Sequence, residues 1–230
     1  MRYDRLVADD SIIFYDWPYS PFCIKVRAIL DYKKAEYRTV EALAARGRLK
    51  RRGTGKVPAI EIGGRFITDS TEIAYALDEL IPKPPLLPNS RRDQALCNAL
   101  EDWADESLYF TGLYYRWYDK AGRAEIPAKF GKSIRGRFAY AYYLRLVLRQ
   151  LKGHGTLRKA RKLVDRDLER NLDAIDRLLT PGPFLFGDKP CLADFAVWGQ
   201  LNYLNRTPAG GQALKGRDRT VAFLRRLGSK

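Results

Sequence analysis

The sequence has few of the side chains that most often bind metals. Its 230 residues contain one histidine and three cysteines. Histidine-rich metal sites are therefore excluded, and a Ser-His-Asp triad would depend on His154, which lies between two glycines. Cys23, Cys97 and Cys191 are odd in number and far apart, which excludes a disulfide scaffold and a four-thiolate zinc site. We expect no bound metal and a reducing compartment.

Long apolar runs are also missing. No stretch approaches the roughly 18 uninterrupted apolar residues of a transmembrane helix, and the first ten residues, MRYDRLVADD, lack the apolar run of a signal peptide. Hydrophobic residues nevertheless make up 46% of the chain and aromatic residues 12%, which is enough to form a core. We expect a globular, soluble, cytoplasmic protein.

Acidic residues are scarce relative to basic ones. The chain has 42 Lys and Arg against 27 Asp and Glu, a net charge of +15. Residues 1–80 carry 14 − 12 = +2 of this charge, so the other +13 lies in residues 81–230. Between these parts, residues 81–90 hold four prolines, a density that cannot continue a helix or a central strand. The sequence therefore predicts a domain at 1–80, a linker at 81–90 and a second domain at 91–230.

Alternating strand and helix patterns fill the first domain. Ser20 followed by Pro21 is typical of a helix start, with a hydroxyl at the N-cap and proline at the first helical position. Gly63 and Gly64 suit the tight turn of a hairpin, and Asp69 with Glu72 fits a capping box. The predicted order is βαβαββα, with strands at 11–17, 36–40, 56–62 and 65–68 and helices at 21–35, 41–50 and 69–80.

The helix that follows Ser20 has one apolar face, and Cys23 lies on it with Val26, Ile29 and Leu30, whereas Lys25 is expected elsewhere. The sequence SPFC has the spacing of a CxxC redox pair with serine in place of the attacking cysteine. A lone Cys23 cannot form the internal disulfide of a dithiol reductase. We therefore interpret Cys23 as a packing residue, with a monothiol role as the alternative.

The second domain is predicted to be helical throughout. Helical spacing covers about 90–118, 134–151 and 156–179, and no good strand appears. The first of these helices ends in an aromatic cluster: Tyr109, Phe110, Tyr114, Tyr115, Trp117 and Tyr118. Aromatic residues at helical spacing are more often core than binding site, although a ligand pocket is the alternative.

Four motifs together resemble the soluble glutathione S-transferases: SPFC, then GKVPAI, then TDSTEIAYAL, and finally FLFGDKPCLADFAVW at residues 184–198. They occur in that family's order and at about its spacing, and they cover nearly the whole chain. The resemblance implies a thioredoxin-like α/β domain followed by an all-α domain. It also implies that glutathione is a co-substrate, with no metal or tightly bound cofactor, and that the protein is a homodimer that acts in detoxification.

Each glutathione-site motif implies a role. Ser20 would donate a hydrogen bond to the glutathione sulfur and stabilise the thiolate, helped by the positive end of the helix dipole. Val57 would pair with the cysteinyl part of glutathione, before a cis Pro58. Asp69 and Ser70 would hold the γ-glutamyl carboxylate at the next helix start.

The basic run before Val57 and Pro58 is the candidate contact for the glycyl carboxylate. Lys56 is the first candidate, with Arg46 and Arg48 behind it, and a solvated basic surface is the alternative. In the second domain, Asp194 is interpreted as the N3 acid of a capping box whose N-cap position is occupied by Cys191, a folding role. The resemblance thus implies attack of glutathione thiolate on an apolar electrophile bound between the domains.

One region departs from this pattern. Residues 116–170 carry 16 basic and five acidic residues, and the helix around Phe138 and Tyr142 is both basic and amphipathic. Such a helix suits an anionic membrane or phosphates. The stretch is similar to the metaxin-like branch of the superfamily, which implies an alternative function as a non-catalytic binding or assembly module. Non-specific binding to nucleic acid is a further alternative, although no sequence-reading motif is present.

Overall fold

A computed structural model describes residues 11–124 and 126–227. The first ten residues, in which we expect no signal peptide, lie outside the described part. The chain divides into two compact units, 1–94 and 95–230. No helix in the described part is long and apolar enough to cross a membrane.

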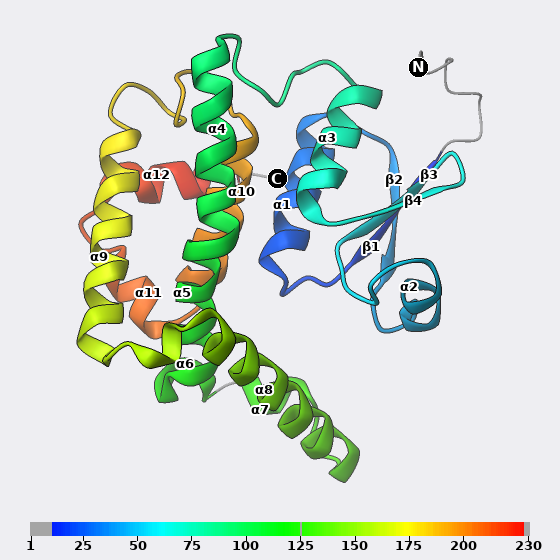
Figure 1. Ribbon diagram of the computed structural model, residues 1–230, viewed down its shortest axis with the longest axis vertical. Coiled ribbons are helices and arrows are strands. Elements are labelled where there is room, and N and C mark those ends of the chain that lie inside the picture. Colours follow the sequence, from blue (N-terminus) through cyan, green and yellow to red (C-terminus); the bar gives the residue numbers. More distant parts are fainter. Residues whose placement is uncertain (1–10, 125, 228–230) are drawn as a thin grey trace. The chain divides into compact units, whose positions relative to one another are not determined.

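The first unit contains a four-stranded sheet with three helices (Figure 1). Its strands lie in the order β2-β1-β3-β4, with β1 parallel to β2 and antiparallel to β3, and β3 antiparallel to β4. The elements are β1 (Ile12–Asp16), α1 (Pro21–Tyr32), β2 (Tyr37–Glu41), α2 (Arg46–Arg52), β3 (Ala59–Ile62), β4 (Arg65–Thr68) and α3 (Ser70–Leu80). This is the predicted βαβαββα order.

Two local predictions in this unit were wrong. The second helix begins at Arg46 and not at residue 41, because Glu41 continues β2 and pairs with Asp16 of β1. Lys25 is fully buried, although we expected it away from the apolar face. It lies four residues after Pro21 and four before Ile29, on a row of α1 that faces the unit's interior.

The elements of the second unit are helices in its described residues, apart from an isolated β-bridge between Phe184 and Gly187. A long helical segment begins at α4 (Arg91–Trp103) and continues through π-helical η1 (Ala104–Leu108), α5 (Tyr109–Leu113) and π-helical η2 (Tyr114–Tyr118). It is followed by α6 (Lys120–Arg123), α7 (Ile126–Lys129), α8 (Ile134–His154), η3 (Thr156–Arg158), α9 (Arg161–Leu178), α10 (Leu192–Asn205), α11 (Pro208–Ala213) and α12 (Asp218–Leu227). Helix α10 is almost entirely buried and forms the centre of this unit.

Buried polar groups fix the start of α10. The Asp194 carboxylate is fully buried and accepts hydrogen bonds from the backbone N–H groups of Cys191, at 2.9 Å, and Leu185, at 2.8 Å. The Cys97 thiol lies 3.4 Å from the Cys191 thiol and accepts from the N–H of Ala193. The expected capping role of Asp194 is thus confirmed, and Cys97 of α4 supplies a sulfur acceptor where the N-cap has no hydroxyl.

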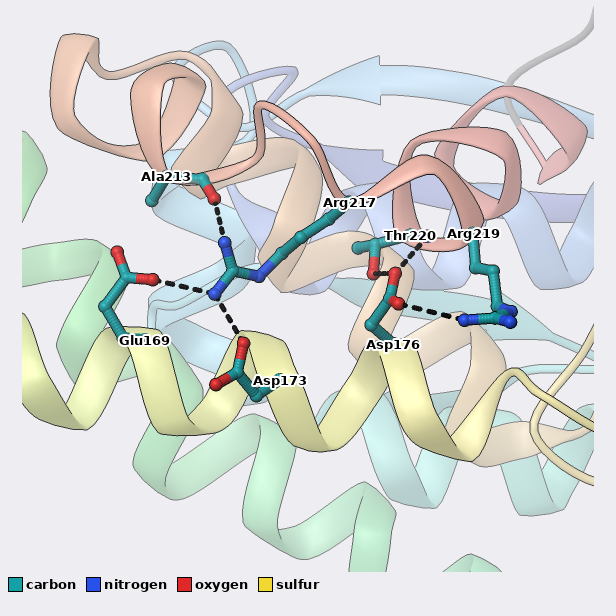
Figure 2. Close-up of polar contacts among 7 residues, drawn as sticks. All are labelled: Glu169, Asp173, Asp176, Ala213, Arg217, Arg219 and Thr220. Carbon is teal, nitrogen blue, oxygen red and sulfur yellow. Dashed lines mark hydrogen bonds and ion pairs between the residues drawn. The ribbon is translucent and has the colours of Figure 1, made fainter.

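Ion pairs and hydrogen bonds connect α9 to α11 and α12 (Figure 2). The Arg217 guanidinium contacts Glu169 at 2.7 Å and Asp173 at 2.6 Å, and it also donates to the carbonyl of Ala213. Asp176 accepts from the N–H and hydroxyl of Thr220 in the first turn of α12. These contacts hold the C-terminal helices against α9.

Candidate functional site

The strand register of the first unit brings three loop segments to one edge of the sheet. Tyr15, next to the end of β1, lies opposite Ala59, the first residue of β3. Ala59 also lies opposite Thr68, the last residue of β4. The segment after β1, the segment before β3 and the segment after β4 therefore meet at this edge. These segments carry Ser20, the Val57–Pro58 pair and the Asp69–Ser70 pair.

Ser20 caps the N-terminus of α1, as predicted. Its hydroxyl oxygen accepts from the N–H of Cys23 at 3.3 Å, and its side chain is half-buried. Pro21 occupies the first helical position, where its missing N–H costs nothing. Because the oxygen is the acceptor in this cap, the hydroxyl proton can still be donated to an anion at the helix start.

Cys23 lies one turn further along α1, and its side chain is fully buried. Its sulfur accepts from the N–H of Trp17 at 3.4 Å. Burial raises the pKa of this thiol to about 12, so the thiolate is not formed near neutral pH. The interpretation of Cys23 as a packing residue is confirmed.

The peptide bond between Val57 and Pro58 is cis, as the resemblance implies. Val57 packs against a small apolar cluster of Tyr15, Ala45, Leu49 and Ala59, which ties the loop to α2 and the sheet. Lys56, just before this pair, is exposed. Its side chain is therefore accessible to an anion in solution.

Asp69 precedes α3 in an unusual backbone conformation, with φ at 76° and ψ at 130°. Positive φ is rare outside glycine, and such residues are concentrated at functional sites. Its carboxylate accepts from the N–H of Thr71 at 2.9 Å and of Glu72 at 3.4 Å, so it already satisfies two of the free donors of α3. Ser70 is buried beside it.

Lys25 is a residue of this region that the sequence interpretation missed. Its Nζ lies 3.4 Å from the hydroxyl of Thr71 and so connects α1 to the first turn of α3. A buried ammonium group here adds positive charge near two helix N-termini, which are themselves positive. The sequence spacing does place Lys25 on the same side of the helix as Pro21 and Ile29, and this spacing was the pattern that indicated its burial.

Part of the basic run has another partner. Arg48 and Arg52 both contact the carboxylate of Glu61 at 2.6 Å, and the hydroxyl of Tyr15 donates to the same carboxylate at 3.0 Å. Burial raises the pKa of Glu61, but the hydrogen bonds from Arg48 and Tyr15 outweigh it, so the net pKa is lowered. Arg48 therefore fastens α2 to the β3–β4 hairpin, and Lys56 is the better candidate for the glycyl carboxylate.

The aromatic cluster of the second unit is mostly core. Tyr114, Tyr115 and Trp117 are buried, the Tyr115 hydroxyl bonds Asp165 at 2.6 Å, and the Trp117 indole bonds the Tyr203 hydroxyl at 2.8 Å. Tyr109 and Phe110 are half-buried and Tyr118 is exposed. A ligand pocket at these last three residues stays a prediction.

The single histidine serves the packing of the second unit. The His154 ring stacks on Phe110, with centroids 3.8 Å apart, and its Nδ1 lies 2.7 Å from the Thr156 hydroxyl. Burial lowers its pKa. A cavity of about 380 Å³ with a polar lining adjoins it. Across the described ranges, no group of His, Cys, Asp and Glu side chains is arranged to hold a metal.

These features define a thioredoxin-like domain and a helical domain. Comparison with family models gives the family. The model of the glutathione S-transferase N-terminal domain matches residues 14–85, and that of the C-terminal domain matches residues 137–226. The chain belongs to the glutathione S-transferase superfamily, and the predicted fold class is confirmed. A sequence search against curated proteins found no match.

Solved structures share the fold over nearly the whole chain. A beta-etherase from Sphingobium sp. strain SYK-6 superposes with a TM-score of 0.71 at 18% identity, covering 96% of both chains. A glutathione transferase from Phanerochaete chrysosporium has a TM-score of 0.70 at 21% identity, covering 95% of this chain and 96% of its own. A glutathione S-transferase from Methylobacterium radiotolerans, solved with glutathione sulfonate, has a TM-score of 0.64 at 19% identity, covering 96% and 91%.

Proposed function

We propose that this protein is a glutathione S-transferase that conjugates glutathione to an apolar electrophile. The observation that carries the proposal is the meeting of three loop segments at one sheet edge, with Ser20 at the N-terminus of α1. Family membership supports glutathione as the co-substrate. Glutathione carries two carboxylates and a thiol, and this edge offers helix N-termini, a hydroxyl and Lys56.

Ser20 is the proposed catalytic residue. Its hydroxyl donates to the glutathione sulfur and, with the dipole of α1, lowers the thiol pKa toward working pH. The thiol proton leaves to solvent, and the thiolate then forms a carbon–sulfur bond with the electrophile. In a substitution, the carbon's bond to its leaving group breaks and takes its electron pair away. Cys23, which stays protonated, takes no part.

The remaining assignments concern binding. The Ser70 hydroxyl and the positive N-terminal end of α3 hold the γ-glutamyl carboxylate, while Asp69 orients this turn. The backbone of Val57, set by Pro58, pairs with the cysteinyl part. Lys56 attracts the glycyl carboxylate. We also propose a homodimer, as in the family, with a role in detoxification in the cytoplasm.

Titration calorimetry with glutathione, together with conjugation of chlorodinitrobenzene, tests the proposal. Ser20→Ala is expected to keep glutathione affinity within about threefold but to lower the conjugation rate by about a hundredfold, because a donor to the developing anion is lost. Ser133→Ala is the matched control, since Ser133 also caps a helix by accepting from an N–H, that of Gly136, at 3.1 Å.

The alternative, a non-catalytic binding or assembly module, makes a different prediction. In that case the wild type would show no conjugation above the uncatalysed rate, and Ser20→Ala would behave like Ser133→Ala. Absence of glutathione binding at millimolar concentration would overturn the transferase proposal outright.

A further inference from the structure

Helix α8 exposes an apolar stripe to solvent. Ser133 caps its N-terminus and Gly155, with φ at 94°, ends it, so the helix is well defined at both ends. Ile134, Phe138 and Tyr142 follow one another at intervals of four and so share a face. Their side chains are 72%, 74% and 63% exposed, and the first two are the most exposed large hydrophobic residues of the described chain.

The opposite side of α8 is anchored in its own unit. Val147 and Leu151 are buried, and the Phe130 ring near α7 packs against the rings of Tyr140 and Tyr143. In Figure 1, α8 extends with α7 away from α9 and α10 of the same unit. The exposed stripe therefore belongs to a helix whose opposite face is packed. Its exposure does not result from fraying of a helix end.

Positive charge surrounds this stripe. The sequence of α8 contains five Lys and Arg and no Asp or Glu. On α8, Arg135 and Arg137 flank Ile134 and Phe138, while Arg145 and Arg149 continue the exposed face toward the C-terminus. An open, largely apolar groove of about 420 Å³ runs along this half of the helix. It is lined by Tyr140, Ala141, Leu144, Arg145, Leu148, Arg149, Lys152 and Leu157.

We propose that α8 is a membrane-docking helix that lies in the headgroup region of a bilayer containing anionic phospholipids. Apolar side chains flanked by Lys and Arg are the pattern of helices that lie in this plane. Ile134, Phe138 and Tyr142 enter the acyl boundary, and the guanidinium groups of Arg145 and Arg149 bind lipid phosphates. The helix lies on the membrane and does not cross it, since no described helix is apolar enough to span.

Two other occupants fit less well. Pairing of α8 with α8 of a second copy would bring two acid-free basic clusters within about one Debye length, ~10 Å at 0.1 M salt, with no acid between them. Nucleic acid would satisfy the arginines but would leave Ile134 and Phe138 in water, since phosphates offer them no apolar surface. A bilayer with anionic headgroups above an apolar acyl layer can interact with both the arginines and the apolar side chains of this face.

Vesicle co-sedimentation of the full chain tests the proposal. We expect binding to vesicles of phosphatidylcholine and phosphatidylglycerol at three to one, and none to phosphatidylcholine alone. Arg145→Glu with Arg149→Glu should weaken binding by at least about thirtyfold, from a factor of roughly five for each lost attractive charge. Ile134→Ser with Phe138→Ser should weaken it at least about tenfold, because buried apolar area is lost.

Matched controls separate the helix from general charge and hydrophobicity. Arg91→Glu with Arg92→Glu makes the same change in net charge on exposed residues of α4, and Leu43→Ser removes an apolar side chain that is 64% exposed. Both should bind anionic vesicles like the wild type. Circular dichroism and glutathione affinity should be unchanged in all variants, because every substituted side chain is exposed.

Two results would overturn the proposal. The first is no sedimentation with anionic vesicles in 0.1 M salt, and the second is equal loss of binding in the α4 control and the α8 charge variant. After the first result, loss of duplex DNA binding or of a dimer in the α8 variants would assign the face to nucleic acid or to a second copy.

Discussion

Cys23 and Ser20 lie one turn apart in α1, and their surroundings give them opposite chemistry. The serine is half-buried at the helix start. The cysteine is fully buried, and burial raises its pKa to about 12. At pH 8 the Cys23 thiol is therefore almost entirely protonated. The apolar helical face in the sequence was sufficient to predict this environment.

We therefore expect Cys23 to resist alkylation. Iodoacetamide at pH 8 should leave its peptide unmodified in the folded protein, because the reagent needs an accessible thiolate. The same peptide should be modified fully in urea, which serves as the internal control. Mass spectrometry of the digested protein reads out both states. Modification of the folded protein at the rate of a free cysteine would show that Cys23 is accessible and reactive.

Lys25 is a residue whose burial the sequence interpretation predicted wrongly. A charged side chain on an otherwise apolar row is normally read as solvent-exposed, since burying an ammonium group costs free energy unless it is compensated. Here one of its partners, Thr71, is 46 positions away in the sequence. A partner at that distance cannot be seen in local periodicity.

Lys25→Met should weaken glutathione binding by about tenfold, because it removes a buried positive charge near the proposed carboxylate site. The free energy of unfolding should change little, since methionine fills a similar volume without a charge to desolvate. Arg51→Met, an exposed substitution in α2, is the control for net charge. Calorimetry gives the dissociation constants, and equal affinities for the two variants would show that Lys25 serves only the packing of α1 on α3.

Elements were predicted well where pattern and end signals agreed. Helix α1 begins at its Ser-Pro signal, and the β3–β4 hairpin turns at Gly63 and Gly64, both with positive φ. Helix α2 has no capping side chain at its start, and the sheet extends to Glu41 instead. Leu49 packs the buried face of α2, and Arg48 and Arg52 also contact Glu61, a long-range contact that the sequence shows only as a basic run.

The Glu61 cluster predicts a pH dependence of stability. The pKa of Glu61 is lowered from its ordinary value of 4.5 in the folded protein. A lowered folded-state pKa adds stability above the unfolded-state value, and this contribution is lost as the pH falls through the folded-state value. The advantage of the wild type over Glu61→Gln should therefore be full at pH 6 and should shrink steadily below about pH 4.5.

Urea unfolding of both proteins across this pH range measures the difference. Glu79→Gln, an exposed substitution in α3, controls for the loss of one negative charge. A constant difference between wild type and Glu61→Gln at all pH values would mean that the cluster contributes through packing and not through the ionised carboxylate.

At the scale of the whole molecule, charge and motif give different kinds of information. The order of motifs predicted the fold, because each one marks a local backbone event such as a cap or a turn. The candidate site at the sheet edge was proposed from the same motifs. Net charge said nothing about the fold, but its uneven distribution marked the region that contains α8. Which face of α8 is free depends on tertiary packing by Val147 and Leu151, which charge alone does not show.

The net charge of +15 should also govern how salt affects stability. Like charges repel in the compact state, and salt screens this repulsion. The same salt weakens ion pairs such as Arg161 with Asp165, but exposed pairs contribute little each. We expect the unfolding temperature to rise by several degrees from 0.02 to 0.2 M sodium chloride, since each kcal/mol corresponds to about 2–4 °C at this chain length.

Arg145→Gln with Arg149→Gln should have a higher unfolding temperature in low salt and a smaller increase with salt, because part of the repulsion is already gone. A temperature that falls with salt in calorimetry would show that ion pairs, and not net repulsion, dominate the electrostatics of this fold.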